Sequence, residues 1–286
     1  MINSMYVRIA ALLTCHNRKS KTYDCLMSLA KGEKKCQIDV FLTDDGSTDG
    51  TADMIKNEFP KVHLIFGDGN LYWSRGMYSS WKEALKGDYD YYLWLNDDII
   101  LYDTFLEELF ECYKIVGGHA IVSGLIEDIN KTEIIYGGCN ENKQIIKSGN
   151  RPNNIMFMNG NVVLIPKSVV DTIGIIDPVF HHDLGDVDYG LSAVENGIKV
   201  VSTRIPIGAG YKNNYCRVRK WGVSINKRFK VLYSPLGSVP SINYYYRKKH
   251  FGILNAISYW LYLHIINTIS DKMCVIMFGN KYIDEE

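Results

Sequence analysis

The chain of 286 residues can form one large domain or two small ones, and its 47% hydrophobic content is sufficient for a substantial core. Its zero net charge hides an asymmetry, because residues 1–195 hold 28 acidic and 18 basic residues whereas residues 196–286 hold 4 acidic and 14 basic residues. We therefore expect a basic C-terminal part that faces an anion, and no nucleic-acid partner, because the sequence has no nucleic-acid-binding motif.

The first 125 residues alternate short apolar runs with segments of helical spacing. Such alternation predicts an α/β fold with a parallel sheet whose strands are joined by right-handed crossovers. The predicted strands are residues 7–13, 38–42, 62–66, 91–95 and 120–125, and the predicted helices are residues 19–30, 51–57, 78–85 and 103–116.

From about residue 126 the pattern changes to shorter strands and turns. No linker rich in Pro, Gly or Ser is visible, so we predict one compact domain over residues 1–205, followed by a C-terminal extension over residues 206–286. The predicted strands in this part are residues 133–136, 144–147, 162–165 and 199–202, and the predicted helices are residues 167–173 and 186–196.

Polar side chains follow four of the predicted strands at the point where each strand ends. In an open parallel sheet the carboxyl ends of the strands lie at one edge, and ligands bind beyond that edge. The sequence therefore predicts a binding site that is built from residues 14–17, 44–47, 67–70 and 96–98.

Asn96-Asp97-Asp98 follows the apolar strand predicted at residues 91–95. Adjacent carboxylates repel each other unless a positive charge lies beside them. Mg²⁺ is a suitable partner because it binds one or two carboxylates together with phosphate oxygens of a substrate. The alternative is a solvated turn that leads into the next helix.

Asp44-Asp45-Gly46 follows the second predicted strand. Gly46 can adopt the positive φ of a turn, and the polar residues after it can cap the next helix. Since one acid suffices for a cap, the doubled carboxylate indicates a further role, such as accepting a hydrogen bond from a base or a ribose hydroxyl.

A third acidic segment contains Asp183, Asp186 and Asp188, at the start of the last predicted helix of the domain. These carboxylates can simply cap the helix and offset its dipole. A carboxylate within hydrogen-bond reach of a hydroxyl can instead act as a general base. His181 and His182 have no partner at metal-ligand spacing, so we expect them at the surface or beside a substrate.

In their order and spacing these motifs resemble those of the family 2 GT-A glycosyltransferases, over roughly residues 5–205. More narrowly, they are similar to the rhamnosyltransferase-like branch that builds bacterial surface polysaccharides such as lipopolysaccharide and capsule. The motifs are Leu12-Leu13-Thr14-Cys15-His16-Asn17-Arg18, Asp44-Asp45-Gly46-Ser47-Thr48-Asp49-Gly50, Gly69-Asn70-Leu71-Tyr72-Trp73, Asn96-Asp97-Asp98 and Asp186-Val187-Asp188.

The resemblance implies a GT-A fold, which is Rossmann-like with a mostly parallel central sheet flanked by helices. Its nucleotide-sugar part would span about residues 1–125 and its acceptor part about residues 126–205. It also implies a nucleotide diphosphate-sugar donor, an inverting transfer, and a glycan or lipid-diphosphate-linked glycan as acceptor. The residues that the resemblance places in donor binding are Thr14, Asn17, Asp44, Asp45, Asn70, Arg75 and Asp97.

Mg²⁺ or Mn²⁺ is the cofactor that the resemblance implies. Asp98 matches the metal-binding acid of the family's DxD motif, whose first position is Asn96 in this chain. That departure leaves Asp98 as the firm carboxylate ligand, with Asp97 nearby.

The catalytic base implied by the resemblance is Asp186. Family members usually have a Glu-Asp pair at this place, whereas this chain has Gly185-Asp186. Asp188 is the second candidate for the base, and the acceptor side of the site is expected to include Asn159, His182 and Asp188.

The C-terminal extension combines basic and aromatic residues with a charge-free stretch of 20 residues, 251–270. Because polar residues interrupt this stretch, we predict an interfacial or packed helix. Basic residues beside apolar ones favour an anionic membrane surface, and the alternative is a solvated basic face.

With no signal-peptide pattern and no CxxC spacing among seven cysteines, we expect a cytoplasmic protein, peripheral on the inner face of the cell membrane.

Two other functions are compatible with such a sheet. A sugar nucleotidyltransferase would carry a glycine-rich phosphate loop after the first strand, but residues 14–18 contain no glycine. A non-catalytic protein that binds a nucleotide sugar or a glycan would keep the fold without a working base.

Overall fold

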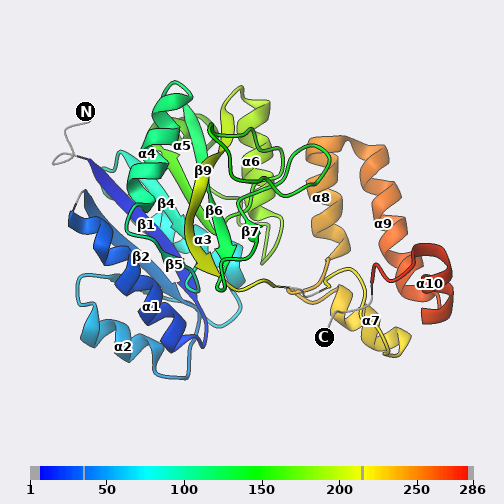
Figure 1. Ribbon diagram of the computed structural model, residues 1–286. Helices are drawn as coiled ribbons and strands as arrows, with labels where there is room; N and C mark the ends of the chain where they lie inside the picture. Colours follow the sequence, from blue (N-terminus) through cyan, green and yellow to red (C-terminus); the bar gives the residue numbers. More distant parts are fainter. Residues whose placement is uncertain (1–6, 35, 214–215, 283–286) are drawn as a thin grey trace. The chain divides into compact units, whose positions relative to one another are not determined.

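The computed structural model describes residues 7–34, 36–213 and 216–282 (Figure 1). These residues form two compact units. The first unit contains the described residues up to Pro178 together with Gly185–Lys212, and the second contains Val179–Leu184 and the described residues from Asn213 onward.

A mixed sheet forms the centre of the first unit. Its strands are β1 (Arg8–Cys15), β2 (Gln37–Asp44), β3 (His63–Phe66), β4 (Tyr91–Leu95), β5 (Ile100–Leu101), β6 (Ala120–Asp128), β7 (Ile134–Tyr136), β8 (Val162–Pro166) and β9 (Lys199–Gly210). The strand order is β3-β2-β1-β4-β8-β6-β9-β5, and β7 pairs with β6 outside this series. Strands β3, β2, β1 and β4 run parallel, whereas β8 runs antiparallel to both β4 and β6.

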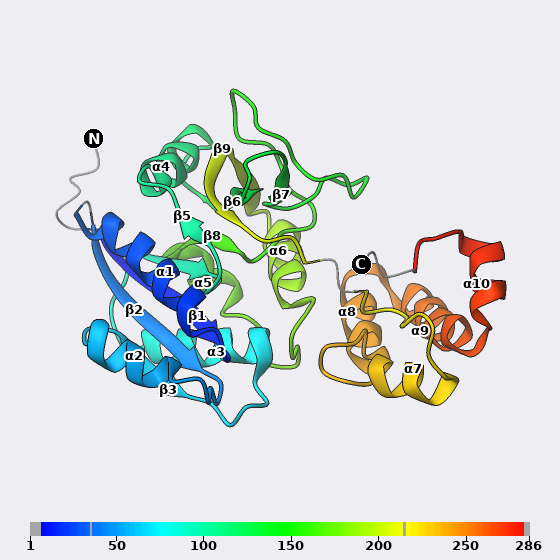
Figure 2. The same cartoon turned by 60° about the horizontal axis from the view of Figure 1, so that its bottom comes forward.

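Helices cover both faces of this sheet, because the strand residues that point to either face are apolar. Ile9, Ala11 and Leu13 of β1 belong to one core, and Ala10 and Leu12 belong to the other. The first core is closed by α1 (Lys19–Ala30), α2 (Thr51–Glu58) and α4 (Phe105–Ile115), and the second by α3 (Tyr72–Ala84), α5 (Lys167–Ile173) and α6 (Gly185–Glu195) (Figure 2).

The predicted α/β fold with a central sheet flanked by helices is confirmed. Helices α1 and α5 and strand β4 begin and end at the predicted residues. Strand β8 was predicted at residues 162–165, but its antiparallel direction was not, because a fully apolar strand carries no signal of its direction.

Residues 144–147 were wrongly predicted as a strand. Ile145 makes one isolated bridge with Cys139, and no named strand forms over this described segment. The chain before Cys139 cannot serve as a regular partner strand, since Gly137 and Gly138 have φ angles of 134° and 111°.

Helix α3 begins at Tyr72, six residues before the predicted start. Tyr72 has a φ of 57°, and no side-chain cap precedes it. The start of the helix is fixed instead by a carboxylate from a distant strand, which is described below. Sequence signals for a helix start are local, so they could not show it.

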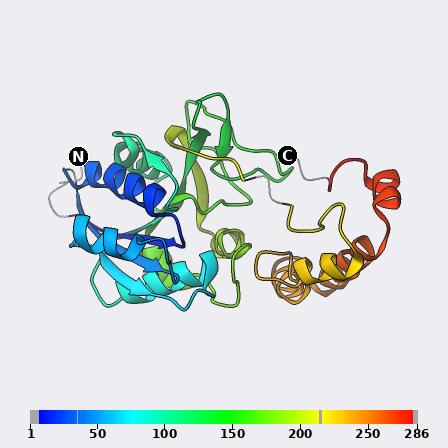
Figure 3. The same cartoon turned by 90° about the horizontal axis from the view of Figure 1, so that it is seen from below.

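The second unit is helical, with α7 (Ile225–Leu232), α8 (Pro240–Phe251), α9 (Ile253–Thr268) and α10 (Asp271–Phe278). Helix α9 packs against α8 and α7, as Figures 2 and 3 show. Gly252, with a φ of 84°, separates α8 from α9. None of the helices formed by the described residues is long and apolar enough to span a membrane.

Two of the basic residues in the second unit are buried and form ion pairs inside it. The guanidinium groups of Arg219 and Arg228 are buried, and each lies 2.6 Å from Asp271 Oδ1. Both also donate to the carbonyl of Ile269 just before α10. The expectation that the basic segment faces an external anion is therefore wrong for these two residues, whose anionic partner is Asp271.

We expect the substitution Gly76→Ala to destabilise the first unit. A Cβ at this position of α3 would clash with Thr14 Oγ1 and lie 2.7 Å from Thr14 Cβ. Helix propensity alone would favour alanine by up to about 1 kcal/mol, whereas overpacking costs about 1–3 kcal/mol. Urea unfolding should therefore show a loss of free energy of unfolding. Ser79→Ala in the same helix is the control, and a gain in stability for Gly76→Ala would contradict the prediction.

Candidate functional site

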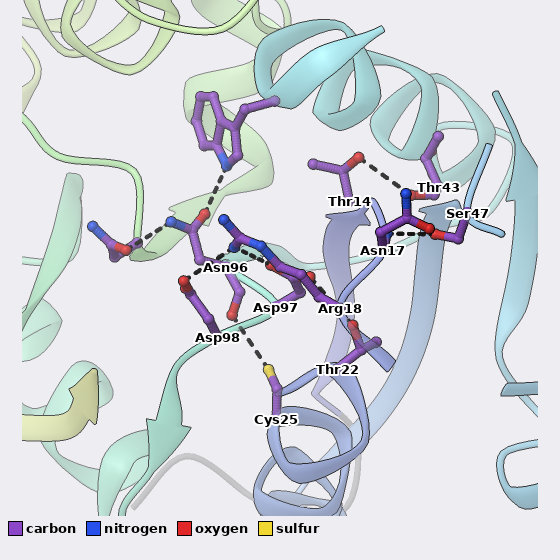
Figure 4. A network of polar contacts seen from close by, with 12 residues as sticks. Thr14, Asn17, Arg18, Thr22, Cys25, Thr43, Ser47, Asn96, Asp97 and Asp98 are labelled. Carbon is purple, nitrogen blue, oxygen red and sulfur yellow. Dashed lines mark hydrogen bonds and ion pairs between the residues drawn. The ribbon is translucent and has the colours of Figure 1, made fainter. Parts of the chain in front are cut away.

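An ion cluster lies at the carboxyl end of β4. One guanidinium nitrogen of Arg18, NH1, donates to Asp97 Oδ1 at 3.0 Å and to Asp98 Oδ2 at 3.0 Å (Figure 4). Thr22, in the first turn of α1, donates its hydroxyl to Asp97 Oδ2 at 3.2 Å. The positive charge that the two adjacent acids require is thus supplied by the loop that follows β1.

Burial and the ion pair act on the pKa values of this cluster in opposite directions. Burial raises the pKa of Asp97 to about 6, although the charge of Arg18 opposes the shift. Burial also acts to lower the pKa of Arg18, but the carboxylates of Asp97 and Asp98 outweigh it and raise that pKa. Each partner therefore favours the charged form of the other.

Asp45 acts on the backbone of the loop that precedes α3. Its Oδ1 accepts from the N–H of Gly69 at 2.8 Å, and its Oδ2 accepts from the N–H groups of Leu71 and Tyr72 at 2.9 Å each. These bonds satisfy a carboxylate that is buried beside the positive end of the helix dipole. Asp44 is also buried, and its Oδ1 accepts from the N–H of Ser47 at 2.9 Å.

Thr14 and Asn17 join the loops that follow β1 and β2. The Asn17 side-chain oxygen accepts from the N–H of Thr48 at 2.7 Å, and Ser47 Oγ accepts from the N–H of Asn17 at 2.9 Å. Thr14 Oγ1 donates to the carbonyl of Thr43 at 3.2 Å (Figure 4). Four of the predicted donor-binding residues, the acids 44 and 45 included, are thus part of one connected edge of the sheet.

The indole of Trp73 links this edge to Asp186. Its Nε1–H donates to Asn96 Oδ1 at 2.6 Å, directly before the acid pair. Trp73 also lies against Gly160, where an added Cβ would be 2.6 Å from the ring and 3.1 Å from Asp186 Cβ. The N–H of Gly160 in turn donates to Asp186 Oδ2 at 2.9 Å. One aromatic side chain therefore borders both acidic segments.

Asn96 also connects to the segment before β8. Its side-chain nitrogen donates to Asn161 Oδ1 at 2.6 Å, and the Asn161 side chain donates to that of Asn159. Asn159 accepts from Ser123 Oγ through its backbone carbonyl. This amide chain ties the end of β4 to the predicted acceptor side, where Asn159 lies.

The other predicted site residues lie as follows. Asp188 is buried in α6, whereas Asn70 is exposed beside Asp68. Arg75 Nε donates to the carbonyl of Pro178 at 3.0 Å. His182 belongs to the second unit, so it is not placed relative to the site.

Sequence reasoning missed the roles of two residues, Arg18 and Trp73. The need for a positive charge beside Asp97 and Asp98 was evident from the sequence, but the charge was assigned to Mg²⁺ and not to Arg18, which lies next to the predicted loop of residues 14–17. Trp73 gave no such signal, because it precedes the predicted helix of residues 78–85 and an aromatic residue there usually indicates packing.

A divalent cation would find two carboxylates here, those of Asp97 and Asp98. No group of three or more His, Cys, Asp or Glu side chains suited to a metal ion occurs among the residues that the structure describes. Two carboxylates nevertheless suffice for Mg²⁺ when substrate phosphates supply further oxygens. The convergence of two oxygens on one cationic nitrogen shows that the pair suits a shared positive charge.

We expect Asp97 to make the stability of the protein depend on pH. Because its pKa of about 6 in the fold exceeds the ordinary value of about 4, the contribution of Asp97 to stability is full below pH 4 and is lost as the pH rises through 6. Urea unfolding in metal-free buffer at pH 4.5 and 7.5 should show that the free energy of unfolding of wild type falls over this interval by roughly 2 kcal/mol relative to that of Asp97→Asn. Parallel pH profiles for the two proteins would contradict the prediction.

Comparison with known proteins places the chain in a family. The sequence model of Glycosyl transferase family 2 matches residues 11–174, whereas no curated protein matches by sequence. Among solved structures, S. aureus TarS 1-349 is similar with 10% identity and a TM-score of 0.57, over 96% of this chain and 73% of that one. A longer structure of S. aureus TarS is 12% identical with a TM-score of 0.54, over 95% of this chain and 46% of that one. These likenesses confirm the predicted GT-A-like fold. Since the family match spans more than half of the sequence, the chain belongs to glycosyl transferase family 2.

Proposed function

We propose that this protein is an inverting glycosyltransferase that moves a sugar from a nucleotide diphosphate-sugar to a hydroxyl of a glycan or lipid-linked glycan, in the synthesis of a cell-surface polysaccharide. The observation that carries the proposal is the position of Trp73, which contacts Asn96 beside the acid pair and lies against Gly160, the partner of Asp186. A donor diphosphate at the pair and an acceptor hydroxyl at Asp186 would then lie on opposite sides of the transferred sugar.

The donor would bind along the edge formed by the loops after β1, β2 and β4. Asp44, Asn17 and Thr14 would line the nucleoside end, while Asn70 and Arg75 flank the start of α3. Asp97 and Asp98 would hold Mg²⁺ or Mn²⁺ together with the diphosphate oxygens. When bound, the ion would offset the negative charge that develops on the leaving nucleoside diphosphate.

Asp186 would act as the base. Its Oδ2 accepts from the N–H of Gly160 and its Oδ1 from the N–H of Val187, both at 2.9 Å, so the carboxylate is held in one orientation. The acceptor oxygen would attack the anomeric carbon while its proton passes to Asp186. The bond from that carbon to the diphosphate breaks, and the nucleoside diphosphate leaves with the electron pair.

The two rival functions differ in their products. A nucleotidyltransferase would release pyrophosphate from a nucleoside triphosphate, whereas a glycosyltransferase releases a nucleoside diphosphate from a nucleotide sugar. A binding protein would release neither product. The membership in glycosyl transferase family 2 favours the glycosyltransferase over the nucleotidyltransferase and the binding protein.

We expect Asp186→Asn to lower the turnover at least 100-fold, because the amide cannot take the acceptor proton. The donor is first identified by thermal stabilisation with a panel of nucleotide sugars, with and without Mn²⁺. The glycan acceptor is chosen in the same way, from a panel of glycans. Release of nucleoside diphosphate is then measured with the chosen donor and acceptor.

Asp171→Asn is the matched control for this substitution. Asp171 is exposed on α5 and pairs with Lys167 at 3.4 Å, so its loss should leave turnover unchanged. Equal turnover of Asp186→Asn and wild type, with equal melting temperatures, would rule out Asp186 as the base.

We also propose that the second unit binds an anionic membrane surface on the cytoplasmic side. Helix α9 is apolar on two faces: Ala256, Leu263 and Ile266 are buried, whereas the opposite face is exposed. Leu254 is 78% exposed, and Lys248 and Lys249 are exposed in the last turn of α8. An exposed apolar face beside basic residues suits lipid headgroups and the acyl boundary beneath them. The exposed apolar residues of α9 are Ile253, Leu254, Ile257, Trp260, Leu261 and Ile265.

Sedimentation with vesicles that contain phosphatidylglycerol should remove the protein from solution at low salt, and high salt should release it. Leu254→Glu should weaken the binding about tenfold, since the burial of one leucine side chain is worth about 1.5 kcal/mol or more. Leu85→Glu, at an exposed apolar position of the first unit, is the control. Failure to bind the anionic vesicles at low salt would refute the membrane proposal.

A further inference from the structure

The cluster at the end of β4 contains its own cation, and that cation is the least buried member. Asp97 and Asp98 side chains are 5% and 19% exposed, whereas the Arg18 side chain is 47% exposed. Asp97 is also fixed from other directions, because it accepts from Thr22 and the preceding Asn96 is held by Trp73 and Asn161. The guanidinium is therefore the part that can move.

The geometry of Arg18 differs from an ordinary ion pair. A guanidinium commonly meets one carboxylate with two nitrogens, in a fork. Here one nitrogen lies 3.0 Å from an oxygen of each of two carboxylates. A single positive centre between two acids is the arrangement that a shared divalent cation would adopt.

The backbone of Arg18 is anchored at the start of α1, and its long side chain extends from there to the two acids. The carbonyl of Arg18 accepts from the N–H of Thr22 at 2.9 Å, in the first turn of α1. A guanidinium that leaves the acids would thus stay within a side-chain length of them. It would need a new anionic partner there, and a donor diphosphate is such a partner.

We propose that Arg18 is an intrinsic competitor for the divalent cation: it occupies the position between Asp97 and Asp98, a cation must displace it, and the displaced guanidinium then binds the donor diphosphate. The last step rests on the proposed glycosyltransferase function, whereas the competition does not. The consequence is that the cation binds weakly to the protein alone and more tightly once a donor can accept Arg18. Arg18 thereby couples the loading of the two ligands.

The test measures Mn²⁺ binding to the protein without nucleotide, by electron paramagnetic resonance of the free ion. Arg18→Gln and Arg18→Met both remove the charge, and each should bind Mn²⁺ at least tenfold more tightly than wild type. Arg18→Lys keeps a charge and should remain within about threefold of wild type. Lys21→Gln removes a neighbouring charge from α1 that lies over the ring of Tyr211, and it should leave the affinity unchanged.

Equal or weaker Mn²⁺ binding by either folded neutral variant would overturn the proposal, as would the lack of saturable binding by both. Two neutral variants are used because the loss of Arg18 leaves the buried Asp97 without its counter-ion. A rise in melting temperature with Mn²⁺ that is larger for the neutral variants than for wild type is the second expected result. Neither readout requires sugar transfer, so this test stands apart from the Asp186→Asn experiment.

Discussion

The arrangement of the site depends on the carboxylate of Asp45. A buried acid at the end of β2 would be costly without partners, and it is satisfied by three backbone N–H groups from the loop that leads into α3. These bonds fix where α3 begins and therefore where Trp73 lies. The indole in turn orients Asn96 and borders Gly160 and Asp186. A single carboxylate thus aligns segments that lie far apart in the sequence.

The negative charge at the end of β4 is partly offset within the chain, by Arg18. Asp97 is buried and has a raised pKa, which shows how unfavourable its ionised form would be alone. Arg18 compensates for this cost while it remains half-exposed. The protein can therefore fold with both acids in place before any ligand arrives, and the binding of a ligand exchanges one positive partner for another.

Much of the fold was predictable because its elements carry local signals. The apolar strand β4 and the helices α1 and α5 have regular patterns, and their bounds were predicted correctly. The start of α3 was not predictable, since it is set by Asp45 from another strand. The acids at the strand ends were recognisable from residue types as candidates for a site, and their chemistry stays a prediction. The contact of Arg18 with both acids is a matter of loop geometry, and no spacing in the sequence reports it.

The position of β8 has a mechanical consequence. Because β8 pairs with β4 on one side and β6 on the other, a continuous sheet underlies both the donor edge and the segment that carries Asn159. Closure of two halves of the first unit about a hinge would break the backbone hydrogen bonds between these strands. Rearrangement within the first unit during a catalytic cycle should consequently be confined to its loops and side chains.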